Sequence, residues 1–240
     1  TFDEAIALVD ASYREFSPTL ADHAMRVIAD RHLDAQIRDH KMDGAYCYGA
    51  LPSLTPWVLT NFTGRIRDVS TLAHELGHAV HAMMASEHSV LTFHASMPMA
   101  ETASVFGEML LMDKLLRAES DPLLRRTLLS TFLDEAYATI VRQAYFVLFE
   151  REAHQLIRDG GMPDDVNAIY LENLREQFGS AMVLSDDFSV EWTAISHIYQ
   201  TPFYCYAYAF GNLLVLALYR KYQEIGDPFV PGYLKILSYG

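Results

Sequence analysis

The 240-residue sequence contains few cysteines and few basic residues. Its two cysteines, Cys47 and Cys205, lie in apolar stretches and predict no disulfide framework, which indicates a reducing compartment and a cytoplasmic location. Lysine and arginine together number 18 against 31 aspartates and glutamates, so the formal net charge is −13. An acidic chain of this kind is poorly suited to bind nucleic acid or an anionic membrane, and we expect neither as a partner.

The sequence also lacks a signal peptide, internal repeats, low-complexity tracts and long linkers. One apolar and aromatic run, residues 202–219, has roughly the length of a membrane span. Tyr204, Tyr206 and Tyr208 place hydroxyl groups in this run, and buried hydroxyl groups need hydrogen-bond partners. We therefore interpret the run as a core helix.

Helical periodicity dominates the chain and predicts a mainly α fold. The expected helices cover residues 2–16, 19–37, 69–87, 98–118, 122–158, 164–178 and 202–225. Residues 57–62 are β-prone and lie between Pro56 and Gly64, so they predict a strand of a small ribbon whose edge either binds an extended peptide or closes one side of a cleft. The glycine-containing stretch 43–49 is interpreted as either a mobile loop or a turn.

The most informative segment is His-Glu-Leu-Gly-His at residues 74–78. Residues four apart lie on the same face of a helix, so His74 and His78 can offer two imidazole nitrogens to one metal ion. Glu75 lies beside them, as in the H-E-x-x-H arrangement of zinc metallopeptidases. Asp68 and Ser70 are expected to cap this helix, and the apolar neighbours predict a dry site. The alternative, two core histidines with a glutamate paired to an arginine, would be costly to bury without a metal.

A third metal ligand is required, and two kinds of candidate are present. The metzincin pattern is excluded because His81 and Met84 occupy the positions where it needs glycine and histidine. His81 follows His78 by one turn and is a ligand, a hydrogen-bond donor to a ligand, or a neighbour packed against the site. The other solution is a carboxylate from a second helix, which would give a His2Glu site.

Glu101 is a candidate for this role, because 23 positions separate it from His78, enough for a loop and a returning helix. Ser104 and Glu108 follow on the same helical face. We expect one ligand together with a partner that orients a histidine. The alternative for Glu108 is a solvated charge near a helix end.

Several ordered segments resemble the oligoendopeptidase F branch of the thimet oligopeptidase/neurolysin family. They are residues 44–47, 56–64, 67–81, 101–108 and 197–211. The resemblance covers about residue 40 to the C-terminus and implies a helical, zincin-type (neurolysin-like) catalytic domain with a small β-ribbon beside the active-site helix. Because similar enzymes are much longer, we expect residues 1–240 to be a C-terminal catalytic region without the N-terminal helical lobe and the extreme C-terminus.

The resemblance also implies functional residues. His74, His78 and Glu101 would bind one Zn²⁺ per chain, and Glu75 would be the general base. Binding of the substrate carbonyl and the oxyanion would fall to His197 and Tyr206. Phe203 stands where the mammalian enzymes carry a tyrosine, which leaves Tyr204 and Tyr208 as alternatives, and Tyr199 is a further candidate for substrate contact.

The implied activity is zinc-dependent hydrolysis of internal bonds in short peptides. A metallocarboxypeptidase or dipeptidyl carboxypeptidase on the same scaffold is the first alternative, and it would need a cation for the substrate's terminal carboxylate. Only Arg220 and Lys221 lie close to the late segment, which favours the endopeptidase. The second alternative is a catalytically silent peptide-binding fragment, against which Glu75 argues because a purely structural zinc site needs no general base.

Overall fold

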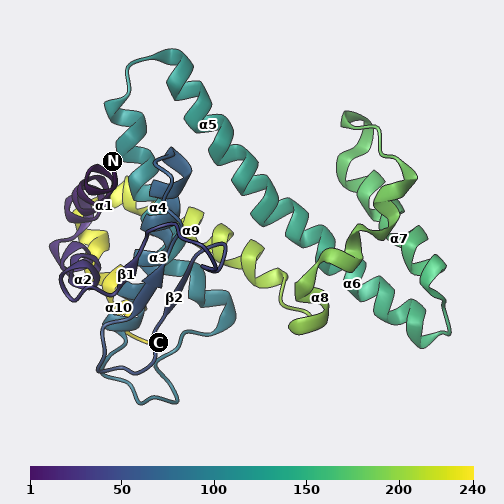
Figure 1. Cartoon of the computed structure of the whole chain (residues 1–240), viewed down its shortest axis with the longest axis horizontal. Coiled ribbons are helices and arrows are strands. Elements are labelled where there is room, and N and C mark those ends of the chain that lie inside the picture. Colours follow the sequence, from purple (N-terminus) through teal and green to yellow (C-terminus); the bar gives the residue numbers. More distant parts are fainter. The chain divides into compact units, whose positions relative to one another are not determined.

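The computed structural model describes residues 1–240 and divides into two compact units (Figure 1). Unit 1 consists of Thr1–Leu129 and Leu214–Gly240, and unit 2 consists of Ser130–Leu213. The mainly α fold with a small sheet agrees with the prediction from the sequence. No helix combines the length and the apolar character that crossing a membrane would require.

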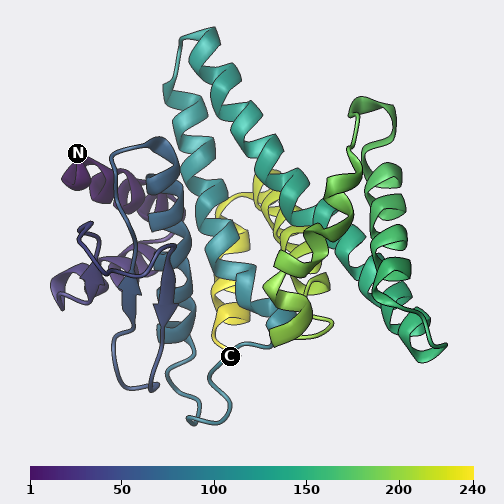
Figure 2. The same cartoon turned by 45° about the vertical axis from the view of Figure 1, so that its right-hand side comes forward.

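Unit 1 is built on a core of apolar side chains from several helices. Its elements are α1 (Phe2–Phe16), α2 (Pro18–Ala29), β1 (Leu33–Asp34), β2 (Tyr46–Tyr48), β3 (Trp57–Leu59), α3 (Ile66–Met84), α4 (Met97–Ala118), the start of α5 (Pro122–Ala136), the end of α9 (Tyr206–Ile225), a 3-10 turn (Asp227–Phe229) and α10 (Val230–Leu237). Helices α3 and α4 pack side by side, and strands β2 and β3 lie along α3 (Figure 2).

The strands form one mixed sheet in the order β1-β3-β2. Strand β1 runs parallel to β3, whereas β2 is antiparallel to β3 and pairs Cys47 with Val58. Two predictions were wrong here. The helix expected over 19–37 ends at Ala29, because Arg31 takes a left-handed backbone (φ 59°) and His32 accepts a hydrogen bond from Val58. The stretch 43–49 contains β2, because long-range pairing with β3 overrides its local turn character.

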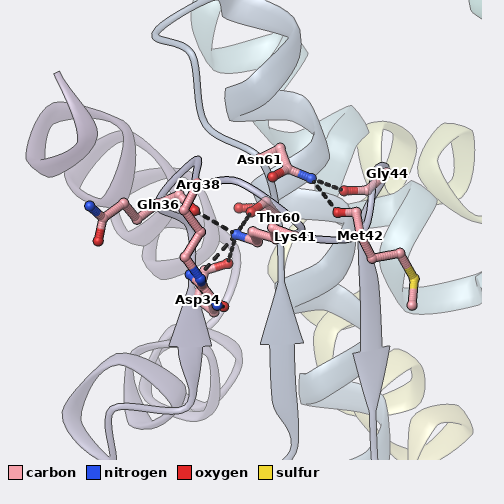
Figure 3. A network of polar contacts seen from close by, with 8 residues as sticks. All are labelled: Asp34, Gln36, Arg38, Lys41, Met42, Gly44, Thr60 and Asn61. Atoms are coloured by element: carbon pink, nitrogen blue, oxygen red, sulfur yellow. Dashed lines mark hydrogen bonds and ion pairs between the residues drawn. The ribbon is translucent and has the colours of Figure 1, made fainter.

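A buried lysine fastens the loop between β1 and β2 to the end of β3 (Figure 3). The Lys41 side chain is 2% exposed, and its Nζ donates to the carbonyl oxygens of Asp34, Gln36 and Thr60 at 3.0, 3.0 and 2.6 Å. It also lies 3.1 Å from the Asp34 carboxylate. Asn61 donates to two further carbonyls of the same loop, those of Met42 and Gly44, each at 3.0 Å. These contacts set the course of the chain into β2.

Unit 2 has a separate small core. Its elements are the end of α5, a π-helical stretch (Tyr137–Arg142), α6 (Gln143–Arg158), α7 (Pro163–Phe178), 3-10 segments (Gly179–Ala181 and Asp186–Ala194), α8 (Ser196–Gln200) and the start of α9. Glu191 links three elements, because it accepts hydrogen bonds from Arg142 and Tyr170 at 2.7 and 2.8 Å.

Three helical features differ from the expected ones. The predicted helix 122–158 is helical throughout but is π-helical over Tyr137–Arg142. Helix α9 begins at Tyr206 and not at residue 202, because Phe203 has a left-handed backbone (φ 62°) that a helix cannot continue through. The sequence patterns did not predict the short helix α10.

Candidate metal centre and its surroundings

Helix α3, which carries the His-Glu-Leu-Gly-His motif, crosses closely over helix α4, which carries Glu101 and Glu108. Gly77 lies at this crossing, where an added Cβ would be 2.6 Å from Ser104 Cα and 2.7 Å from the Ala103 carbonyl oxygen. Because backbone atoms cannot move aside as a flexible side chain can, only glycine allows this approach. The result is that His74 and His78 of α3 face Glu101 of α4.

Three donor atoms of these residues form a compact triangle. His74 Nε2 and His78 Nε2 are 3.1 Å apart, and they lie 3.3 and 3.5 Å from Glu101 Oε2. A tetrahedral zinc ion with ligands at 2.0–2.1 Å places neighbouring ligand atoms about 3.3 Å from each other. The triangle therefore has the size that zinc requires, and it leaves one tetrahedral position open.

Neighbouring side chains orient two of the three donors. Glu108 Oε1 lies 2.5 Å from His74 Nδ1, so a proton on Nδ1 leaves the Nε2 lone pair directed at the triangle. The Ser104 hydroxyl donates to Glu101 Oε2 at 2.7 Å. His81 is buried and is not part of the triangle, and burial lowers its pKa although a hydrogen bond with the Ala100 backbone opposes this.

The pKa values of His74 and His78 are shifted in opposite directions. Burial lowers the pKa of His74, but the hydrogen bond and charge of Glu108, helped by Glu101, outweigh it and raise that pKa to about 9. Burial, followed by the nearby His74 charge, lowers the pKa of His78 to about 4. The site is less dry than expected, since the two side chains remain 26% and 24% exposed.

Glu75 occupies a more buried position than the two histidines and is 6% exposed. Burial raises the pKa of Glu75 to about 7, and the charge of His74 opposes this shift. Cys47 of β2 lies nearby, and burial together with the charge of Glu75 raises the pKa of its thiol to about 12. Asp68, expected before the helix, lies in its first turn and accepts the backbone N–H groups of Thr63 and Arg65 at 2.7 and 3.0 Å.

In unit 2, two of the predicted tyrosines, Tyr204 and Tyr208, lie against His197. His197 Nε2 lies 3.0 Å from the Tyr208 hydroxyl, and its ring stacks on Tyr204 with a centroid distance of 5.6 Å. Tyr206, which the sequence comparison favoured as the companion of His197, is 47% exposed at the start of α9. Tyr199 is also exposed, with its ring beside Trp192.

Residues 6–240 match the model of Peptidase family M3. The chain belongs to this family. Oligopeptidase PepF of Bacillus subtilis is 31% identical over 216 residues, which cover 89% of this chain and 32% of the relative. An oligoendopeptidase F homolog of Borreliella burgdorferi is 29% identical, with 89% and 37% covered. This M3 chain thus spans about a third of the length of the curated relatives it matches.

Two crystal structures share the fold of this chain. A candidate peptidase from Chlamydophila abortus superposes with a TM-score of 0.83 at 30% identity, covering 100% of this chain and 41% of its own. Oligoendopeptidase F from Enterococcus faecium superposes with a TM-score of 0.59 at 22% identity, covering 99% and 45%. The second similarity bears on the fold alone.

Sequence patterns did not point to Glu150, which lies beside the His197 segment of this M3 chain. Glu150 of α6 is 1% exposed, and its Oε1 accepts the Phe203 backbone N–H at 2.8 Å. This bond holds the left-handed turn that precedes α9. Local sequence patterns do not reveal the role of Glu150, because its partner lies 53 residues away and a glutamate in a helix normally faces solvent.

Proposed function

We propose that this chain is the catalytic region of a zinc-dependent endopeptidase that hydrolyses internal bonds of short peptides. The observation that carries the proposal is the triangle of His74, His78 and Glu101 donors with edges of 3.1–3.5 Å. Membership of family M3 supports the peptidase activity, and the names of the relatives support short peptides as substrates. A zinc ion held there would supply Lewis acidity toward a water molecule and the scissile carbonyl.

Protein side chains carry the proton transfers in this proposal. The Glu75 carboxylate, on the residue after His74, accepts the proton of the attacking water and delivers it to the leaving amine. Glu108 and Ser104 keep His74 and Glu101 aimed at the triangle.

The His197 segment supplies hydrogen bonds to the substrate. In the proposal, His197 and Tyr206 donate to the carbonyl oxygen as it gains negative charge. Tyr208 holds the His197 ring through its 3.0 Å contact. Tyr206 is solvent-exposed and so is available to a ligand.

The test combines zinc content with cleavage of an internally quenched peptide that is blocked at both ends. We expect Glu75→Gln to retain one zinc ion and to lower kcat by about 10³-fold, since general acid–base groups contribute this much. His74→Ala should lose the metal. Full activity of Glu75→Gln would exclude the mechanism. Cleavage restricted to peptides with a free C-terminus would favour the carboxypeptidase, and zinc binding without any cleavage would favour the silent fragment.

A further inference from the structure

A buried tyrosine of unit 1 contacts both helices of the candidate metal centre. Tyr13 of α1 is 0% exposed, and its hydroxyl donates to the Ala73 carbonyl oxygen at 2.5 Å. Ala73 directly precedes His74. On its other side the phenol lies against Gly107, where an added Cβ would collide with the hydroxyl and come within 2.8 Å of Cζ. Gly107 directly precedes Glu108, so the phenol lies beside the two residues that precede the partners of the His74–Glu108 contact.

A second buried tyrosine has the same relation to the third ligand. Tyr233 of α10 is 1% exposed, and its hydroxyl donates to the Thr102 carbonyl oxygen at 2.9 Å. Thr102 directly follows Glu101. The Tyr233 ring stacks on Phe106 of α4 with a centroid distance of 4.2 Å. Two different helices therefore each place a phenol on the backbone next to a ligand.

Helix formation itself does not explain these hydrogen bonds. A carbonyl inside an α-helix already accepts an N–H four residues later, and its second lone pair needs no partner. A phenylalanine would fill the same space and would avoid the cost of burying a hydroxyl. The hydroxyl adds a directional hydrogen bond. This bond fixes the position of the carbonyl, and of the adjacent ligand, relative to the helix that carries the tyrosine.

We propose that Tyr13 and Tyr233 are positioning residues that set the spacing of the metal ligands, an inference that rests on the proposed zinc site. The donor triangle tolerates little movement, since its edges of 3.1–3.5 Å match the spacing that tetrahedral zinc requires. Tyr13 fixes α3 next to His74, and Tyr233 fixes α4 next to Glu101. Together they hold the two ligand helices in register before the metal binds.

The experiment measures Zn²⁺ affinity by competition with a chelator, using the metal-free full chain. Tyr13→Phe and Tyr233→Phe keep the ring packing and remove only the hydroxyl. Each should weaken zinc binding about fivefold, the size expected for one hydrogen bond, and the double variant about 25-fold. Circular dichroism checks that each variant remains folded.

Tyr219→Phe is the matched control. Tyr219 is buried in the same core, and its hydroxyl interacts with Asp113, twelve positions beyond Glu101 on α4. The zinc affinity of the Tyr219→Phe variant should equal that of the parent chain. If Tyr219→Phe loses as much zinc affinity as the other two variants, the cause would be a general destabilisation of the core, and the proposal would be overturned.

Two further outcomes separate this proposal from the proposed function. If the parent chain binds zinc and cleaves the blocked peptide while Tyr13→Phe and Tyr233→Phe retain its affinity, the positioning role is wrong and the function stands. If the parent chain binds no zinc, both proposals fail.

Discussion

In unit 1 the candidate ligands lie on two long helices, α3 with 19 residues and α4 with 22, whereas in unit 2 His197 lies on the five-residue helix α8 and is followed by a turn. The two helices of unit 1 are held by their close approach at Gly77 and by the buried hydroxyls of Tyr13 and Tyr233, which donate to backbone carbonyls. The turn of unit 2 relies on a left-handed residue, Phe203, and on one buried carboxylate, Glu150.

This difference suits two chemical tasks. A metal ion requires its ligands within a few tenths of an ångström, and backbone contacts along long helices provide that precision. In the proposed mechanism, the group that binds a developing oxyanion must approach a substrate, and the loop-like segment around Phe203 would carry such a group at lower structural cost. Unit 1 should therefore tolerate small changes at its crossing less well than unit 2 tolerates changes at its turn.

The largest effect is expected from Gly77→Ala, which disturbs the close crossing of α3 and α4 in unit 1. The new Cβ would be 2.6 Å from Ser104 Cα, so α3 and α4 must separate. We expect a loss of about 3 kcal/mol in the free energy of unfolding and at least a tenfold loss of zinc affinity. Gly232→Ala in α10 is the control, because no atom lies within 4 Å of its added Cβ. It should stabilise the chain by up to about 1 kcal/mol in urea unfolding.

Tyr206→Phe tests the substrate-binding side. Loss of an oxyanion donor should lower kcat about 100-fold while zinc content stays the same. Tyr208→Phe should lower kcat about tenfold, because in the proposed mechanism Tyr208 holds His197 and does not contact the substrate. Steady-state kinetics on the blocked peptide checks both. If kcat falls further in Tyr208→Phe than in Tyr206→Phe, Tyr208 would be the oxyanion donor and Tyr206 would not.

Glu150→Leu tests the turn of unit 2. It removes the acceptor of the Phe203 N–H, which should cost about 1 kcal/mol of unfolding free energy and lower kcat severalfold. Glu150→Gln keeps an acceptor oxygen and should restore most of both losses. Zinc affinity should not change in either variant. A zinc affinity that falls together with kcat would contradict the independence of the two arrangements.

The smallest effect is a pH dependence in the sheet of unit 1, away from the metal ligands. Hydrogen bonds from Arg38, with a contribution from Lys41 against opposing burial, hold the pKa of Asp34 below its usual value. Because the folded-state pKa is the lower one, Asp34 stabilises the fold above about pH 4 and loses this effect as the pH falls. Between about pH 5 and pH 3 the parent chain should lose more stability than Asp34→Asn. The difference is small, since the carboxylate is 36% exposed. Urea unfolding at several pH values measures it.

Several local features could be predicted from the sequence. Helical periodicity located α1, α3, α4 and α7 within a few residues, because these helices bury one face and carry recognisable ends. The four-residue spacing of His74 and His78 dictates that both point to one side of α3. Periodicity failed where pairing partners are distant, as for β2, or where a left-handed residue interrupts a helical pattern, as at Phe203.

The sequence by itself determined that two histidines and a glutamate share a helix, and that Glu101, Ser104 and Glu108 share another. Only the tertiary structure decided how closely the two helices cross and which side chains fix them there. Gly77, Tyr13 and Tyr233 act through contacts 26–131 positions apart in the chain, and no local pattern encodes such distances. The physical reason is that periodicity reports the face a residue occupies, whereas the spacing of metal ligands depends on packing between elements.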